Sequence, residues 1–141
     1  MHIVGLMAIL LMLTGCRKED PKPSLTESEK ATALLTSGSG WVIQTVLVDG
    51  VDNTALFAGL KLSYTATDYS TVNGGVIWPA SGTWKFTDDT GKNILRSDGM
   101  PITLNEITST KLVLGLTWSK TTLAGGRENS VAGNHVFTFG H

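Results

Sequence analysis

Catalysis by a serine or cysteine nucleophile requires a neighbouring base, and histidine is the side chain that most often supplies it. The sequence contains three histidines: His2 near the start, His135 in the last strand-like segment, and His141 at the carboxyl end. Of these, only His135 could lie in an active site. Its place in a strand-like segment favours an ordinary residue on the edge or face of a strand. We therefore expect no catalytic residue and no enzymatic activity.

Carboxylate pairs, which hydrolases and calcium loops use, occur at Asp49/Asp52 and at Asp88/Asp89. Both pairs lie beside Gly or Asn in predicted turns, where an Asp side chain accepts hydrogen bonds from its own backbone. Neither stretch has the spacing of a calcium loop. We interpret them as turn residues and expect neither a metal site nor a cofactor.

The four tryptophans are the residues that most favour a ligand site, because an indole combines an apolar ring with an N–H donor. Trp78 precedes Pro79 at the end of a strand-like segment, which places it near a rim. Trp84 and Trp118 lie on alternating apolar faces, and core filling explains them equally well. The candidate ligand-binding residues are Trp78, Trp84, Trp118 and Tyr64.

Cys16 is the single cysteine, so the domain has no disulfide framework and no thiolate metal cluster. Residues 3–13 form an uninterrupted apolar run, which is shorter than the ~20 residues of a membrane span and suits the apolar region of a signal peptide. The Leu13-Thr14-Gly15-Cys16 sequence that follows resembles the bacterial lipobox. The resemblance implies that residues 1–15 are a signal peptide and that Cys16 is lipidated.

In lipoproteins the mature cysteine carries several acyl chains, and two or more chains anchor a protein stably to a membrane. The resemblance thus implies a protein of the cell envelope, held on the outer membrane at its periplasmic face or at the cell surface. Residues 16–24 are predicted to be the lipidated cysteine and a polar, proline-containing tether. The charged residues 17–20 look like the segment that follows the cysteine in surface-exported Bacteroidetes lipoproteins, although a solvated tether explains them equally well.

The composition is that of one folded domain: 141 residues, 41% hydrophobic and 16% charged. The net charge is −1 and the 11 Lys and Arg residues are scattered, which argues against a nucleic-acid partner. Gly125-Gly126-Arg127 looks like an anion-binding loop, but no helix start follows it.

A short helix is predicted after Thr26, because Thr26-Glu27-Ser28-Glu29 forms a capping box. From Trp41 onward, large apolar residues alternate with polar ones, as in strands with one buried face, and turn residues such as Asp49-Gly50 and Asp98-Gly99 separate the segments. The predicted strands lie near 41–48, 58–65, 69–78, 81–87, 93–97, 101–107, 110–120 and 130–139. Asn73-Gly74 could instead mark a hairpin within the third segment, so the count is open by one or two.

Eight antiparallel strands in such a meander close into a barrel that side chains fill or that holds one small ligand. The predicted fold is therefore all-β: an up-and-down barrel over residues 25–141, with a short N-terminal helix. The apolar phase of the strands predicts six inward residues: Trp41, Leu62, Trp84, Leu114, Leu116 and Phe137.

The helix, the Gly40-Trp41 start of the first strand and the glycine-punctuated meander together resemble the lipocalin-like domains of Bacteroidetes lipoproteins. In the wider lipocalins the first-strand motif is Gly-x-Trp, and a late basic residue packs on the tryptophan. Here Ser39 occupies the first place of that motif, and Arg127 is the candidate partner of Trp41.

Two functions follow from this resemblance. The first is non-catalytic binding of a small hydrophobic molecule or a sugar in the mouth of the barrel. The alternative is a structural or accessory surface lipoprotein whose barrel is filled and which contacts envelope proteins or glycans. The volume of the cavity discriminates between them, since a ligand pocket needs about 300 Å³ or more.

Overall fold

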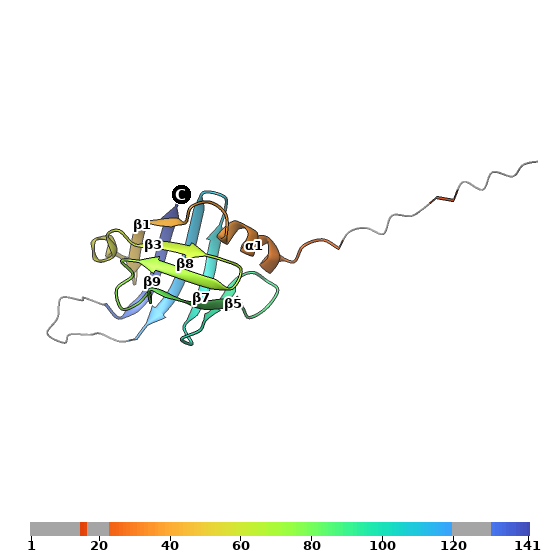
Figure 1. Cartoon of the computed structure of the whole chain (residues 1–141). Coiled ribbons are helices and arrows are strands. Elements are labelled where there is room, and N and C mark those ends of the chain that lie inside the picture. Colours follow the sequence, from red (N-terminus) through yellow and green to blue (C-terminus); the bar gives the residue numbers. More distant parts are fainter. Residues whose placement is uncertain (1–14, 17–22, 120–130) are drawn as a thin grey trace, which may run out of the picture.

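The computed structural model describes residues 15–16, 23–119 and 131–141. The predicted signal sequence up to Thr14, most of the predicted tether and the Gly125-Gly126-Arg127 sequence lie outside these residues. Within them, eight antiparallel strands close into a barrel in chain order, and a ninth short strand lies outside it (Figure 1). The predicted all-β barrel with a short N-terminal helix is confirmed.

The helical elements are α1 (Glu27–Leu35) and the short 3-10 helix η1 (Thr54–Phe57). The strands are β1 (Trp41–Val48), β2 (Val51–Asp52), β3 (Lys61–Tyr64), β4 (Asp68–Val72), β5 (Ser81–Phe86), β6 (Asn93–Arg96), β7 (Pro101–Ile107), β8 (Lys111–Trp118) and β9 (Gly133–Gly140).

Helix α1 covers one end of the barrel, which we call the helix end (Figure 1). The predicted capping box is present: the Thr26 hydroxyl accepts from the Glu29 N–H, and the Glu29 carboxylate accepts from the Thr26 N–H. The helix is joined to the barrel at both of its ends. The Ser28 N–H donates to the Asp89 carbonyl at 3.2 Å, and the Trp41 indole Nε1 donates to the Leu35 carbonyl at 3.0 Å.

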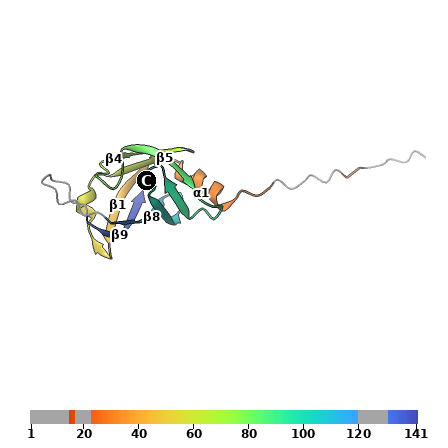
Figure 2. The same ribbon diagram turned by 90° about the horizontal axis from the view of Figure 1, so that it is seen from below.

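The barrel closes because the first long strand pairs with the last. The β1–β9 ladder runs from Val42 opposite Gly140 to Val48 opposite His135, with a register shift between Ile43 and Thr45. Figure 2 shows β4 and β5 lying across the interior from β1, β8 and β9. Closure leaves the eight barrel strands with neighbours on both sides.

The opposite end, which we call the η1 end, has a wall that strand pairing does not complete. The β1–β3 ladder consists of two pairs, at Trp41 and Val42. Beyond them η1 covers the wall: the Asn53 N–H donates to the Val46 carbonyl at 2.8 Å, and the Thr54 hydroxyl accepts from the Val46 N–H at 3.0 Å. Neither β2 nor η1 was predicted from the sequence.

The prediction of a strand over residues 69–78 was too long. Strand β4 ends at Val72, and Asn73 follows in the left-handed conformation with φ of 56°. The Trp78 N–H then donates to the Gly74 carbonyl at 3.1 Å, which forms a turn. A side chain at Gly74 would collide with the Trp78 backbone, so the close approach requires glycine here.

The inner face of the barrel is filled with side chains. All six residues predicted to point inward are buried, with Trp41, Leu62, Leu114 and Phe137 at 0% exposure. Other large side chains that are fully buried are Leu35, Leu60, Ile77, Trp78, Ile94, Ile102, Leu112 and Phe139. They form one continuous core that extends from α1 to the η1 end.

Candidate functional site

Tyr64 and Trp84 pack together in the core. Their rings meet edge to face with centroids 5.2 Å apart, and the Trp84 indole Nε1 donates to the Thr65 carbonyl at 2.9 Å. Burial raises the pKa of the Tyr64 phenol well above its ordinary value. These contacts are those of core residues, and the ligand-binding role of the pair stays a prediction.

Trp78 lies in the connection between β4 and β5, but its ring is directed into the core and is 1% exposed. It meets Phe137 edge to face, with centroids 5.4 Å apart, and the Arg96 guanidinium lies 5.2 Å from its centroid. The sequence placed Trp78 near a rim. The structure instead buries its side chain, because the turn that begins at Asn73 brings it back over the barrel interior.

Arg96 is a buried cation that the sequence did not reveal. It is 2% exposed, and its guanidinium donates to the Ile77 carbonyl at 2.9 Å and to both carboxylate oxygens of Asp98. The hydrogen bonds from Arg96 hold the pKa of Asp98 below its ordinary value. Because each of its nitrogens has a partner, Arg96 closes the core at the η1 end and offers no free charge to a ligand.

His135 lies inside the barrel at 1% exposure. Its ring stacks on Phe137 at 5.7 Å and meets Phe57 of η1 edge on at 6.1 Å. Burial lowers its pKa below the ordinary value, so the neutral ring is favoured. The sequence favoured an ordinary strand residue. Its position in the same phase as Phe137 and Phe139 was the signal that it points inward.

Among the residues that the structure describes, three side-chain nitrogens are buried with no hydrogen-bond partner in that part of the chain: Trp78 Nε1, Trp118 Nε1 and His135 Nε2. Trp118 and His135 lie near each other on the inner face, because the β8–β9 register pairs Trp118 with Gly133 and Leu116 with His135. Phe137 contacts both Trp78 and His135. Phe137 thus links the rings of Trp78 and His135, and buried polar atoms without partners are costly.

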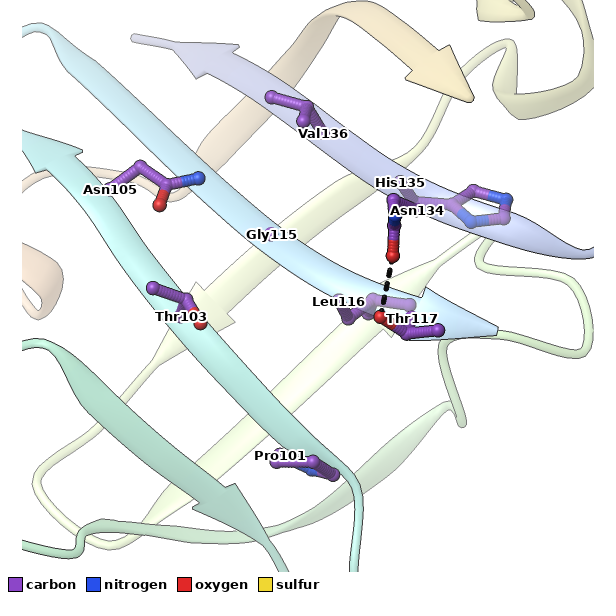
Figure 3. A pocket seen from close by; sticks show the side chains of 9 residues that line it. All are labelled: Pro101, Thr103, Asn105, Gly115, Leu116, Thr117, Asn134, His135 and Val136. Carbon is purple, nitrogen blue, oxygen red and sulfur yellow. Dashed lines mark hydrogen bonds between the residues drawn. The ribbon is translucent and has the colours of Figure 1, made fainter. Parts of the chain in front are cut away.

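The outer wall carries an open groove over β7, β8 and β9, with a volume of about 310 Å³ (Figure 3). Gly115 lies in its middle, directly between Thr103 on β7 and Val136 on β9. The lining residues are Pro101, Thr103, Asn105, Gly115, Leu116, Thr117, Asn134, His135 and Val136. None of the outward-facing ones is charged, and sequence reasoning did not identify this groove.

Two features of the strands shape the groove. Gly115 presents no side chain on the outward phase of β8, which leaves a depression between its neighbours. The β7–β8 register shifts between Leu104 and Glu106, so Asn105 has no partner in the ladder and its side chain amide lies beside Gly115 (Figure 3). At one end, the Thr117 hydroxyl donates to the Asn134 side-chain oxygen at 2.7 Å.

One carboxylate of each pair acts within its own turn, whereas Asp49 accepts from the Asn134 N–H of β9 at 3.0 Å. Asp52 accepts from the Thr54 backbone and hydroxyl, and Asp88 accepts from Thr90 and from the Asn93 side chain. These hydrogen bonds lower the pKa of both carboxyl groups. Within the described ranges no cluster of His, Cys, Asp and Glu could hold a metal ion.

Trp41 has an aromatic partner at the end of the chain. The His141 ring stacks on it with centroids 3.9 Å apart, and His141 Nδ1 lies 2.9 Å from the Gly40 carbonyl oxygen. His141, near the end of the chain, thus covers the face of Trp41, whereas the residue predicted for this contact was Arg127. Arg127 lies outside the described residues.

Cys16 is exposed. In the part of the chain that the structure describes, no helix combines the length and the apolar character that crossing a bilayer requires. No known family model matches the chain, and a search of curated proteins finds no match.

Proposed function

We propose that this protein is a non-catalytic lipoprotein of the cell envelope that acts through the outer surface of a filled barrel, where it contacts envelope glycans or proteins. The filled interior is the observation that carries the proposal. Buried aromatic rings and aliphatic side chains occupy the inner face from α1 to the η1 end. Among the described residues, the outer wall carries a pocket of about 310 Å³, in the groove over Gly115.

The proposal takes the barrel to be a lipocalin-like domain of the kind that Bacteroidetes lipoproteins carry. Lipidation at Cys16 would hold it to the outer membrane, at the periplasmic face or the cell surface. The lipobox-like Leu13-Thr14-Gly15-Cys16 and the exposure of Cys16 support this step. Residues 17–24, which are polar and contain proline, would serve as the tether between the anchor and α1.

Metabolic labelling with radioactive palmitate tests the anchor. The wild-type chain should incorporate the label and fractionate with membranes. The Cys16→Ser variant should not incorporate it, because the thioether-linked lipid requires the thiol. Labelling of Cys16→Ser would contradict the lipoprotein proposal. A Ser24→Ala variant, changed in the same polar segment, should be labelled like the wild type.

A second candidate function is binding of a small hydrophobic molecule or a sugar at the η1 end. The observation that favours it is the set of three buried nitrogens without partners: Trp78 Nε1, Trp118 Nε1 and His135 Nε2. His135 Nδ1 lies 3.0 Å from the Gly133 carbonyl, so it carries the proton and leaves Nε2 as an acceptor. Two donors and one acceptor match a hydroxyl group or a water molecule.

Native mass spectrometry of the purified mature protein separates the two functions. A filled barrel should give the mass of the protein with its lipid and nothing further. A co-purifying molecule that is retained in wild type and lost in a Trp78→Phe variant, which removes one indole N–H while keeping an aromatic ring, would favour the second function instead. Trp41→Phe, at the helix end, is the matched control.

A further inference from the structure

The groove over Gly115 is formed by an unusual choice of residue at the middle of a paired strand. Glycine weakens a strand interior because it loses more backbone entropy on folding than other residues and packs no side chain. The backbone here does not require it, since Gly115 is not in the left-handed conformation. A Cβ would meet the end of the Asn105 side chain at 3.0 Å, an exposed group that can move. What Gly115 does provide is space on the outer wall.

The bulge at Asn105 directs an amide over that space. A β-bulge re-aims a side chain and interrupts the ladder, and bulges recur beside binding sites. Asn105 is outside the β7–β8 ladder, and its side-chain nitrogen lies beside the position that a Gly115 Cβ would occupy. Two departures from regular strand structure, on neighbouring strands, therefore shape the same depression.

The lining chemistry is uncharged and offers both donors and acceptors. The amides of Asn105 and Asn134 and the hydroxyl of Thr103 can donate and accept hydrogen bonds, and the Thr117 hydroxyl, which donates to Asn134, can still accept one. Val136 adds a partly buried apolar surface. On the same wall, the charges of Lys111 and Glu106 are paired with each other at 3.0 Å.

This combination does not suit an extended peptide that adds a strand. β7 and β8 are paired on both sides, and β9 pairs with β8 and β1, so their backbone groups are already used. Recognition in this groove must come from side chains. A charged ligand would find no opposite charge among the outward lining residues to offset its desolvation.

From this geometry we infer that the groove binds an uncharged saccharide, as one or two units of a glycan chain. Sugar hydroxyls donate and accept, as the lining amides and hydroxyls do, and the C–H face of a sugar ring fits the apolar surface at Val136. A volume of about 310 Å³ accommodates a sugar of that size, and the open side lets a longer chain continue. The inference rests on the proposed function and names the surface and the ligand class through which it acts.

The test is titration of the mature lipidated protein, held in detergent micelles, with soluble hexasaccharides of glucose, mannose and xylose. A hexagalacturonate serves as the charged probe of similar length. Binding is followed by isothermal titration calorimetry and by saturation-transfer NMR. We expect at least one neutral hexasaccharide to bind and hexagalacturonate to bind more weakly.

Gly115→Val fills the groove while keeping a residue that favours strands, and it should weaken binding of the neutral hexasaccharide about tenfold or more. Asn105→Ala should weaken binding about threefold to tenfold, the loss expected for one or two hydrogen bonds. Ser70→Val, an equivalent outward change on β4 across the barrel, should bind like the wild type. If Gly115→Val does not fold, the binding affinity of Asn105→Ala tests the inference, because Asn105 is exposed and its truncation should leave the fold intact.

The inference is overturned if none of the neutral hexasaccharides binds at millimolar concentration, if Gly115→Val and Asn105→Ala both bind like the wild type, or if hexagalacturonate binds best. The proposed function fails on different grounds, namely palmitate labelling of Cys16→Ser or a small molecule retained in the barrel interior. Neither of those results depends on Gly115.

Discussion

At the scale of single residues, Trp84 shows how the core is held. Its ring meets Tyr64 and Phe86 edge to face, each with centroids 5.2 Å apart, and its indole nitrogen is paired with the Thr65 carbonyl. Edge-to-face pairs add to the stabilisation that burial alone provides. Removing this one ring therefore opens a cavity and leaves a carbonyl without its donor.

Trp84→Ala should lower the free energy of unfolding by about 3–5 kcal/mol, because lost burial is compounded by the cavity left behind. Urea denaturation followed by circular dichroism measures it. Lys85→Ala on the same strand, where the side chain is exposed, is the control and should change stability by about 0.5 kcal/mol or less. A loss near 1 kcal/mol for Trp84→Ala would instead indicate a solvent-filled interior.

His135 should make the protein sensitive to mild acid. Burial lowers its pKa in the folded state below the ordinary 6.5, and the Gly133 carbonyl and Asp49 offset that effect in part. Below pH 6.5 the unfolded chain then binds a proton that the folded chain does not. Stability is therefore complete above about pH 6.5 and declines as the pH falls toward the lowered pKa of the folded state.

The measurement is the free energy of unfolding of wild type and of His135→Phe between about pH 7 and pH 5, above the range in which carboxyl groups titrate. The variant should show a flatter profile than the wild type, because it lacks the buried titrating ring. Parallel profiles for the two proteins would show that His135 does not contribute.

At this scale, sequence reasoning identified the apolar residues of the core but missed its polar ones. Alternation placed Trp84 and Phe137 correctly, because large apolar side chains have a strong reason to be inside. Arg96 and His135 occupy the same inward phase as Ile94 and Phe137, yet a charged or polar type is ordinarily expected outside. Their burial depends on partners that are distant in sequence, such as the Ile77 carbonyl.

At the scale of elements, α1 is a cover whose start is fixed by its own residues. The Thr26 hydroxyl accepts from the Glu29 N–H at 3.2 Å, and the Glu29 carboxylate accepts from the Thr26 N–H at 2.7 Å. Ala31 and Leu35 are buried against the helix end of the barrel. The helix thus shields the core at Trp41 from solvent.

Thr26→Ala removes the cap and should lower the free energy of unfolding by about 1 kcal/mol. Thr26→Ser keeps the hydroxyl and should be close to wild type. Thermal and urea unfolding check both variants. An unchanged stability in Thr26→Ala would mean that α1 unfolds separately from the barrel and does not share its cooperativity.

The elements that sequence reasoning found were those with several residues of clear periodicity. Strands β1 and β7 have the predicted bounds, and β8 differs by one or two residues at its ends. By contrast, β2 has two residues and η1 has four, too few for any period. The groove also could not be predicted from the sequence, because it forms only when three strands adopt their register. Gly115, at an outward-facing position of β8, was the one sequence feature that pointed to it.

At the scale of the whole molecule, the two ends of the barrel have different roles. The chain enters at the helix end through α1, and η1 lies at the opposite end (Figure 1). With Cys16 in a membrane, the ten residues to Thr26 could extend over at most about 35 Å. The proposed anchor therefore keeps the barrel near the membrane while leaving its outer wall accessible.

Residues 17–23 should be dispensable for folding, because they are polar, contain proline and precede the first residue that caps α1. A chain that begins at Ser24 should melt at the same temperature as one that begins at Arg17. Differential scanning calorimetry of the two chains provides the comparison. A midpoint many degrees lower for the Ser24 chain would show that the tether contacts the barrel.

The pairing of β1 with β9 also sets the order of events in time. Val42 and Gly140 are neighbours in the sheet but lie at opposite ends of the domain sequence. During synthesis the barrel cannot close until β9 has been made, and contacts between segments so distant in sequence form slowly. Until then β1 presents an unpaired edge to other chains. Newly made molecules therefore pass through an aggregation-prone interval, and any truncation that removes β9 makes that interval permanent.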